Sequence, residues 1–449
     1  MTYLEYFASV GEAPGTYFLI MIVTIACYIF ILRKQFYSIF DPLFYATVFG
    51  AFAATCPVFL WWRGLIDTRY FIQFLCTECA FFIGLLLFKP INFNKLNIRA
   101  VEGGGQRRFL NALYMVSATT FILTQAVSYA TLGIPFLSDS RLSYYAAGGG
   151  IGALGHIIGV TWSFSGYLLI YRLARNTETG QRIHLSDIFV GVALLTSVAL
   201  SGSRSGLIQV IFLIFYSRFM LKGRRSGAIA EKFLGRLQKT IMIAAVVGAI
   251  LIVSVKAGGG TIDGSIFVLL QRLAVNGDVF FMAYPTHIID TLSPRGAFLA
   301  LFGSVLAMFR LVPPASLPEP LGFQIFRAVY GSVDFVGPNP RHNVFGVVYL
   351  GVFGATLYSL MLGMMVGFVR NRIPRFVRSG SAIEPLYVFL AISCVAALTD
   401  IGVLMMDIGS VILVAPFLYA AAAILSLAVP PSLFTLRHLS LQSTLSKDS

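Results

Sequence analysis

Long apolar runs separated by short polar segments dominate the sequence. A helix needs about 20 apolar residues to cross the hydrocarbon core of a bilayer, and eleven runs approach or reach that length. They are Thr16–Leu32, Pro42–Leu60, Tyr70–Phe88, Phe109–Ala130, Ile151–Tyr171, Leu185–Leu200, Leu207–Leu221, Thr240–Val255, Asn343–Val369, Pro385–Leu398 and Ile408–Val429. The pattern predicts an all-α polytopic membrane protein with about eleven transmembrane helices.

The basic residues are divided unevenly between the segments that connect these runs. If the runs alternate in direction, one set of segments carries 23 Lys and Arg residues and the other carries 10. Cytoplasmic loops are enriched in Lys and Arg, so the first set is expected inside, with the N-terminus outside and the C-terminus inside. Most of the formal net charge of +14 then reflects topology rather than nucleic-acid binding.

Composition supports the same class. The chain is 57% hydrophobic and 12% charged, with a mean hydropathy of +0.82, whereas a soluble domain is about 25% charged. All five cysteines lie in or beside apolar runs, so a disulfide framework is not expected. The CxxC pair Cys76 and Cys79 lies within a predicted span and is interpreted as two structural thiols.

One long connecting segment, residues 256–342, divides the chain. It has 87 residues and carries six of the ten cations expected outside. Its apolar stretches Ile266–Tyr284 and Gly296–Val312 are each interrupted by an arginine, which suits interfacial or re-entrant helices better than spans. Two further spans are the alternative. The expected parts are a first bundle of about eight spans in 1–255, a large outer segment with short helices in 256–342, about three spans in 343–429 and a cytoplasmic tail in 430–449.

Arg204 is expected on the outer side, in the turn of VALSGSRSGLIQV at residues 198–210. The flanking runs have 16 and 15 residues, about 24 and 22 Å as helices, which is less than the roughly 30 Å of hydrocarbon. The turn is therefore expected to be recessed. With Ser203 as the N-cap, Arg204 would lie in the first turn of the next helix, a place that favours an anion. An interfacial arginine that pairs with lipid phosphates is the alternative.

A second place of this kind is GPNPRHN at residues 337–343. With Asn339 as the N-cap and Pro340 as the first helical residue, Arg341 and His342 would lie in the first turn of a helix at the outer face. Cations are unfavourable at a helix N-terminus unless an anion binds there. His342 has an imidazole that titrates near neutral pH and can transfer a proton; a purely structural histidine is the alternative.

Other polar residues expected outside extend this candidate site. Arg141 lies in a loop with Tyr144 and Tyr145 whose glycines would let it close over a substrate. Lys256 ends a predicted span, and Arg272 and Asn276 are i, i+4 neighbours. Each of these residues alone is compatible with a solvated or lipid-paired side chain, so the hypothesis depends on their convergence.

Sequence motifs for metal or nucleotide chemistry are missing. There is no DxD, HExxH, Walker A or His/Cys cluster with ligand spacing, so neither a metal nor another cofactor is expected. The two halves show no similarity of the kind seen in many transporters. Glu78 is an ionisable residue within a predicted span and therefore a functional candidate, but no second buried acid or base lies at helical spacing from it.

Four polar segments occur in an order that is similar to a known enzyme family. They are GIPFLSDSRLSYY, SGSRSGLIQVIFLIF, VSVKAGGG followed by LLQRLAVNGD, and PEPLGFQIF followed by PNPRHNVFGVVYLGVFG. Together they resemble the Wzy-type polymerases of bacterial surface polysaccharides, such as O-antigen polymerases, and more distantly the O-antigen ligases. The resemblance covers residues 134–354, about half of the chain.

The resemblance implies a GT-C-like, metal-independent glycosyltransferase at the periplasmic face of the bacterial inner membrane. The donor would be a growing glycan on undecaprenyl diphosphate, and the acceptor a single lipid-linked repeat unit. Arg204, Arg272 and Arg341 would contact the diphosphate leaving group, because fixed cations and helix N-termini stabilise its charge without a metal. His342 would activate the acceptor hydroxyl. The further substrate-binding candidates are Arg141, Tyr144, Tyr145, Lys256, Asn276 and Asn343.

Two other functions stay open. An O-antigen ligase would use the same donor but transfer the whole chain to lipid A core. A flippase or other transporter of the lipid-linked glycan would need a continuous cationic cavity that reaches the middle of the membrane. The partners implied are undecaprenyl-diphosphate-linked glycans and the lipid bilayer, with a chain-length regulator and a flippase as possible protein partners and no nucleic acid.

Overall fold

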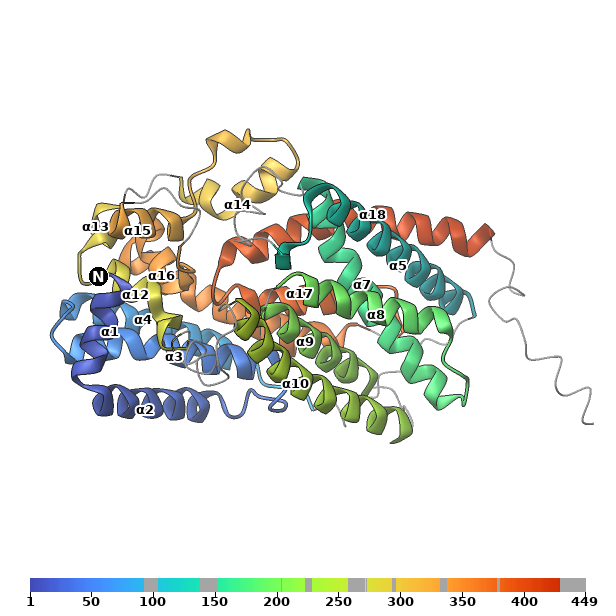
Figure 1. Ribbon diagram of the computed structural model, residues 1–449, viewed down its shortest axis with the longest axis horizontal. Helices are drawn as coiled ribbons and strands as arrows, with labels where there is room; N and C mark the ends of the chain where they lie inside the picture. The colour runs from blue at the N-terminus through green and yellow to red at the C-terminus, as the bar shows by residue number, and fades with distance from the viewer. Residues whose placement is uncertain are drawn as a thin grey trace, which may run out of the picture.

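The computed structural model describes residues 1–92, 104–137, 152–202, 204–222, 228–256, 271, 273–292, 296–331, 337–377 and 380–428. All regular secondary structure in these ranges is helical. Figure 1 shows long helices packed side by side, with short helices gathered at the end that carries the N-terminus. We call this the α1 end, after the helix α1 (Tyr3–Glu12).

Each of the eleven expected runs forms most or all of a helix. These are α2 (Pro14–Leu32), α3 (Pro42–Trp62), α4 (Thr68–Leu86), α5 (Gly104–Leu132), α7 (Gly152–Glu178), α8 (Leu185–Leu200), α9 (Arg204–Lys222), α10 (Ala228–Lys256), α16 (Arg341–Asn371), α17 (Glu384–Ala396) and α18 (Ile401–Ala428). In the described part of the chain, seven helical segments are long and apolar enough to cross a membrane: Pro14–Leu32, Pro42–Trp62, Thr68–Leu86, Gly105–Leu137, Leu154–Glu178, Arg341–Arg375 and Ile401–Ala428. The all-α membrane class is confirmed, while the total of eleven spans stays a prediction.

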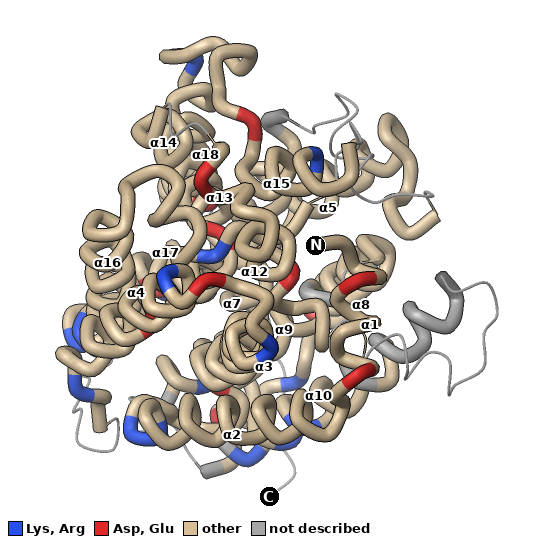
Figure 2. The backbone as a smooth tube through the Cα atoms, turned by 90° about the vertical axis from the view of Figure 1, so that its left-hand side faces the viewer, with Lys and Arg blue, Asp and Glu red and all other residues tan. Residues whose placement is uncertain are grey.

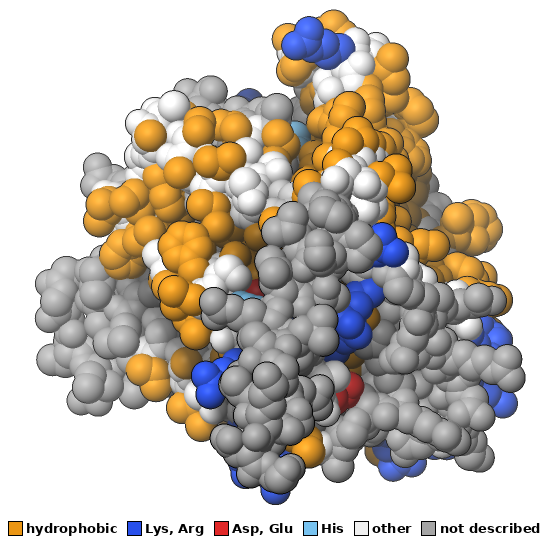
Figure 3. Space-filling view, turned by 90° about the vertical axis from the view of Figure 1, so that its right-hand side faces the viewer, with side chains coloured by type: hydrophobic (Ala, Val, Ile, Leu, Met, Phe, Trp, Pro, Cys, Tyr) orange, Lys and Arg blue, Asp and Glu red, His pale blue; other side chains and the backbone are white. Residues whose placement is uncertain are grey.

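Segments expected on the cytoplasmic side meet at the end of the bundle opposite α1. The side chain of Gln35 donates to the carbonyl oxygen of Phe88 (3.2 Å) and accepts from Asn371 (3.0 Å). The side chain of Gln106 donates to the carbonyl oxygen of Gly380 (2.8 Å). Figure 3 views this end and shows Lys and Arg side chains around it. The contacts between these connecting segments agree with helices that alternate in direction along the chain.

The helix pair α4 and α16 packs unusually closely. A Cβ atom added at Gly363 would lie 2.1 Å from the carbonyl oxygen of Phe81, and one at Gly84 would lie 2.2 Å from that of Leu360. Small residues at such a crossing let two helix backbones approach each other inside a membrane. This contact fixes the position of α16 relative to the polar residues of α4.

The helix α16 is interrupted at Gly351, whose φ of 70° and ψ of 177° are not helical. The segments on either side of it contact each other: a Cβ at Gly346 would lie 2.9 Å from Ala355 Cα, and His342 Nδ1 lies 3.0 Å from Ser359 Oγ. A straight helix would separate residues 342 and 359 by about 25 Å. The run expected to form one continuous span therefore begins with a ten-residue segment that folds back, because glycine tolerates this backbone conformation.

The remaining helices are short. They are η2 (Pro135–Leu137), η3 (Val275–Gly277), α12 (Asp278–Ala283), α13 (Ile288–Thr291), α14 (Ala297–Met308), η4 (Pro314–Ser316), α15 (Leu321–Tyr330) and η5 (Ile373–Arg375). Part of the expected outer segment is inserted among the long helices. A Cβ at Gly277 would lie 2.6 Å from the carbonyl oxygen of Ala53 in α3, and the residues of α12 after Asp278 are fully buried.

Candidate functional site

Arg341 and His342 begin α16, as expected, but they are not at a surface. Their exposed fractions are 7% and 5%. The predicted N-cap at Asn339 is wrong, because Pro340 occupies the cap position without a side-chain capping bond. The backbone N–H of Arg341 donates to the carbonyl oxygen of Thr399 (2.9 Å) instead, and Arg341 has a left-handed φ of 45°. A contact distant in sequence therefore sets the start of this helix.

The beginning of α16 lies deep in the bundle. Asn343 Nδ2 donates to Thr77 Oγ1 (2.8 Å) and to Glu78 Oε1 (3.2 Å). Thr77 is nine residues beyond the first residue of α4, about 14 Å along the helix at 1.5 Å per residue. The expectation that Arg341 and His342 lie at the outer face is therefore corrected: they are level with the middle of α4.

Glu78 supplies the negative charge that this helix start requires. His342 Nε2 lies 3.6 Å from Glu78 Oε1, and the other ring nitrogen contacts Ser359. The Arg341 guanidinium donates to the carbonyl oxygen of Asn276 (3.1 Å) and interacts electrostatically with Glu78. The unfavourable positive charge of Arg341 at the N-terminus of α16 is thus compensated within the protein. The sequence singled out Glu78 and Arg341 separately, but only the α4–α16 contact joins them.

Four of the predicted site residues meet here: Arg341, His342, Asn343 and Asn276. Asn276 also donates through its side chain to the carbonyl oxygen of Phe49 in α3 (2.6 Å). Arg204 is the first residue of α9 and Lys256 the last of α10; the side chains of both lie outside the described part of the structure. The predictions for Arg141, Tyr144, Tyr145 and Arg272 fall wholly outside the described residues.

A cavity of about 580 Å³ lies between α3, α5, α7, α8, α9, α17 and α18. Its described lining is mainly apolar and aromatic, with amide, hydroxyl and carboxylate groups among them. Polar and aromatic residues of the lining include Tyr45, Gln125, Trp162, Ser163, Gln209, Phe212, Ser393 and Asp407. These residues come from several apolar runs that are distant from one another in the sequence, so no local sequence pattern identifies them as one site.

Each predicted helix start is linked to this cavity through a residue of the lining. Ser201 and Gly206, which flank Arg204 in the chain, are part of its lining. Thr399 is also part of the lining and accepts the hydrogen bond from the backbone of Arg341. The next residue, Asp400, accepts from the backbone N–H of Gly402 (2.8 Å), yet burial raises the pKa of its carboxyl group. The segment between α17 and α18 therefore connects the cavity to the buried cluster of Glu78, Arg341, His342 and Asn343.

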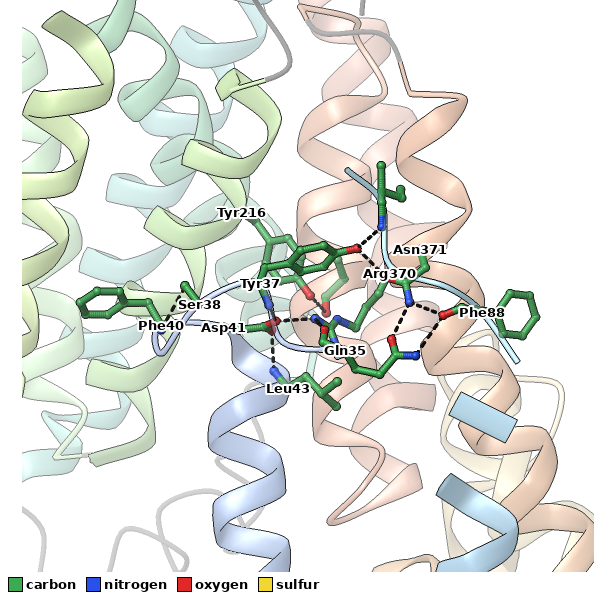
Figure 4. Close-up of polar contacts among 12 residues, drawn as sticks. Gln35, Tyr37, Ser38, Phe40, Asp41, Leu43, Phe88, Tyr216, Arg370 and Asn371 are labelled. Atoms are coloured by element: carbon green, nitrogen blue, oxygen red, sulfur yellow. Dashed lines mark hydrogen bonds and ion pairs between the residues drawn. The ribbon is translucent and has the colours of Figure 1, made fainter. Parts of the chain in front are cut away.

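A second buried polar network lies at the end opposite α1 and is drawn in Figure 4. Arg370 Nη2 donates to Asp41 Oδ2 (2.6 Å), and the two side chains are 1% and 0% exposed. Asp41 also accepts from the backbone N–H groups of Tyr37 and Leu43, both at 2.9 Å. Because the carboxylate already has these protein partners, we interpret the network as structural. It ties the end of α16 to the segment between α2 and α3.

A third charged group lies at the surface of the α1 end. Asp290 Oδ2 accepts from Arg69 Nη2 and from the hydroxyl of Tyr70, both at 2.5 Å, and His287 Nδ1 lies 2.8 Å from the same hydroxyl. Figure 2 views this end and shows basic and acidic residues side by side near α12 and α13. About half of each charged side chain is exposed, so this group is interpreted as a surface contact between α4 and α13.

Metal binding receives no support from the part of the chain that the structure describes. There, no group of three or more His, Cys, Asp and Glu side chains is placed to hold an ion. Comparison with protein-family models, with curated proteins and with solved structures gives no match for the chain.

Proposed function

We propose that the protein polymerises undecaprenyl-diphosphate-linked oligosaccharide repeat units at the periplasmic face of the bacterial inner membrane, as a metal-independent glycosyltransferase. The observation that carries the proposal is the cavity whose lining includes Ser201 and Gly206, on either side of Arg204 in the chain, and Thr399, the hydrogen-bond partner of the Arg341 backbone. Its apolar lining with scattered amide, hydroxyl and carboxylate groups suits a ligand that is part lipid and part sugar, because a pocket of this kind orients its ligand through a few polar groups.

The proposed chemistry needs a stabilised leaving group and a proton acceptor. The acceptor hydroxyl loses its proton, its oxygen bonds to the anomeric carbon, and the bond from that carbon to the diphosphate oxygen breaks. Undecaprenyl diphosphate leaves with the electron pair. The N-terminus of α9, with Arg204 at its first position, is the proposed place for the diphosphate, because free backbone N–H groups and a fixed cation favour that anion.

Arg341 and His342 keep separate roles in the proposal. His342 is the proposed proton acceptor, and Glu78 lies 3.6 Å away, close enough to stabilise the imidazolium that forms. Arg341 is already paired with Asn276 and Glu78. Its proposed contribution is to hold the cavity wall through the hydrogen bond from its backbone N–H to Thr399.

A transporter fits the cavity less well than an enzyme does. A passage for a lipid diphosphate would be expected to carry cations along its length, whereas the described lining contains Asp407 and neither Lys nor Arg. An O-antigen ligase would share the donor and the leaving group, so it stays the second candidate. The two enzymes differ in the acceptor, which is therefore what the experiment must vary.

The test is an elongation reaction with purified protein. The protein is incubated with an undecaprenyl-diphosphate-linked repeat unit and EDTA, and the products are separated on a gel. We expect a ladder of oligomers that Arg204→Ala abolishes. Arg218→Ala is the matched control, because Arg218 lies in the same helix and donates to Gln238 (3.2 Å). Transfer only to lipid A core, or movement of the lipid across vesicles without oligomers, would overturn the proposal.

A further inference from the structure

Several polar side chains of the cavity have unused hydrogen-bonding capacity. Ser163 Oγ is buried, lines the cavity and has no hydrogen-bond partner among the described residues. Gln125, which is half-buried, and Gln209, which is exposed, also line the cavity, and their side-chain amides have no hydrogen-bond partner among the described residues. Buried polar groups are rarely left unpaired in a native protein. The Ser163 hydroxyl therefore points to a ligand that hydrogen-bonds with it, and the two amides can both donate to and accept from the same ligand.

Aromatic side chains provide the complementary apolar surface. Trp162, Tyr45 and Phe212 come from three different helices and line the same cavity. Trp162 uses its ring N–H on the carbonyl oxygen of Leu194 (3.4 Å), and Tyr45 packs edge to face against Phe212 with ring centroids 5.8 Å apart. Amides and hydroxyls between aromatic rings match a sugar, which has polar edges and apolar C–H faces. An acyl chain would leave the buried Ser163 hydroxyl unpaired.

Asp407, the one carboxylate in the described part of the lining, restricts which sugar fits. The Asp407 carboxylate interacts with the nearby hydroxyl of Ser393, and the described lining carries no Lys or Arg to balance its charge. An ionised carboxylate accepts hydrogen bonds from neighbouring sugar hydroxyls. It repels a second carboxylate strongly in a largely apolar cavity.

We propose that this cavity binds one sugar residue of the lipid-linked substrate and selects a neutral hexose or N-acetylhexosamine against a uronic acid. Asp407 is the specificity-determining residue, and Gln125, Gln209 and Ser163 hold the sugar edge. The inference rests on the proposed function for the lipid diphosphate to which the sugar is attached. A cavity of about 580 Å³ lies within the range of roughly 300 to 1,000 Å³ typical of small-ligand sites.

The fluorescence of Trp162 reports directly on this site. The chain has three tryptophans, and replacing Trp61 and Trp62 with Phe leaves Trp162 alone. This protein is titrated with farnesyl diphosphate carrying N-acetylglucosamine, glucose or glucuronic acid, and with farnesyl diphosphate alone. We expect saturable changes with the two neutral sugars and affinity for the glucuronyl compound that is weaker by about tenfold or more, as like charges require.

Asp407→Asn is the decisive variant. Its amide keeps an acceptor for the Ser393 hydroxyl, and we expect the preference against glucuronic acid to fall to about threefold or less once the like charge is removed. Glu12→Gln, at an exposed position of α1, is the matched control and should leave the preference unchanged. Equal responses to farnesyl diphosphate with and without a sugar, or unchanged discrimination in Asp407→Asn, would overturn the inference.

The outcomes also separate the inference from the proposed function. A ladder of oligomers together with unchanged discrimination in Asp407→Asn removes the sugar site but leaves the polymerase. Selective binding at Trp162 in a protein that never elongates any lipid-linked repeat unit removes the polymerase but leaves the sugar site. Melting temperatures of the variants, measured in the same detergent, identify a loss of binding that is due to unfolding.

Discussion

Breaking the buried ion pair between Arg370 and Asp41 should destabilise the protein far more than breaking an exposed pair. In Arg370→Met, the Asp41 carboxylate stays buried without its cationic partner. In Asp41→Asn, the guanidinium is left in the same position. Both side chains are almost completely buried, and they are joined by a hydrogen bond of 2.6 Å. The perturbation therefore strands one charge in a region of low dielectric constant.

The structure sets the size of the expected effect. Removing one partner of a buried pair costs about 3–5 kcal/mol. In Arg370→Met, the backbone N–H groups of Tyr37 and Leu43 still donate to Asp41, so the lower end, about 3 kcal/mol, is expected. Replacing both residues, with Asn and Met, removes both charges and should cost less than either single change. With each single loss at about 3 kcal/mol or more, the resulting coupling between the two sites is about 3 kcal/mol or more.

The assay is reversible unfolding in mixed micelles of SDS and a mild detergent, followed by tryptophan fluorescence. Arg63→Met is the control, because Arg63 pairs with Glu12, whose side chain is 64% exposed. Exposed ion pairs contribute about 1 kcal/mol or less to the free energy of unfolding. A loss in Arg370→Met no larger than in Arg63→Met would refute the reasoning. So would a double variant whose loss equals the sum of the single losses.

Three further predictions test the site and its surroundings. Glu78→Gln should reduce the rate of elongation at least about tenfold, as loss of a charge beside a proton acceptor does. The reason is that the Glu78 carboxylate lies 3.6 Å from His342, and the ladder assay measures the rate. Gly363→Ala should destabilise the protein by about 1–3 kcal/mol through overpacking, whereas Gly15→Ala, whose Cβ meets nothing within 4 Å, should not; the same unfolding assay compares them. Burial raises the pKa of the Asp400 carboxyl group, so the folded state favours its neutral form. The neutral carboxyl group therefore makes its full contribution to stability below about pH 4, and this contribution is lost as the pH rises through the raised pKa. Asp400→Asn should therefore unfold at a higher temperature than the parent at pH 7 and lose this advantage near pH 4.

The sequence was sufficient for the helices but not for the path of the chain between them. Each uniformly apolar run became a helix, since burial in lipid leaves the backbone no other way to satisfy its polar groups. The reversal at Gly351 was missed because hydrophobicity continues unchanged across it. The cap predicted at Asn339 failed because the contact between Arg341 and Thr399 overrides a local preference of about 1 kcal/mol.

The candidate site shows the same division between local and long-range information. Glu78 and His342 each carried a local signal, a charge within an apolar run and a cation at a helix start. Their pairing depends on the α4–α16 contact, which joins positions 264 residues apart. The cavity residues carried almost no signal, since Gln125, Gln209 and Asp407 are single polar positions in three different helices. Local rules identify unusual residues, but only packing shows which of them share a site.

The internal pairing of Arg341 changes how the two cationic helix starts should be interpreted. On sequence grounds they were equivalent, because each places an arginine where a helix N-terminus already carries positive potential. At α16 that potential is balanced by Glu78 and by the carbonyl oxygen of Asn276, so this helix start does not require an external anion. At α9 the flanking residues Ser201 and Gly206 line a cavity large enough for a ligand. We therefore expect the diphosphate to bind beside Arg204 and not beside Arg341. Arg204→Ala should then impair elongation more through loss of substrate affinity than through loss of stability.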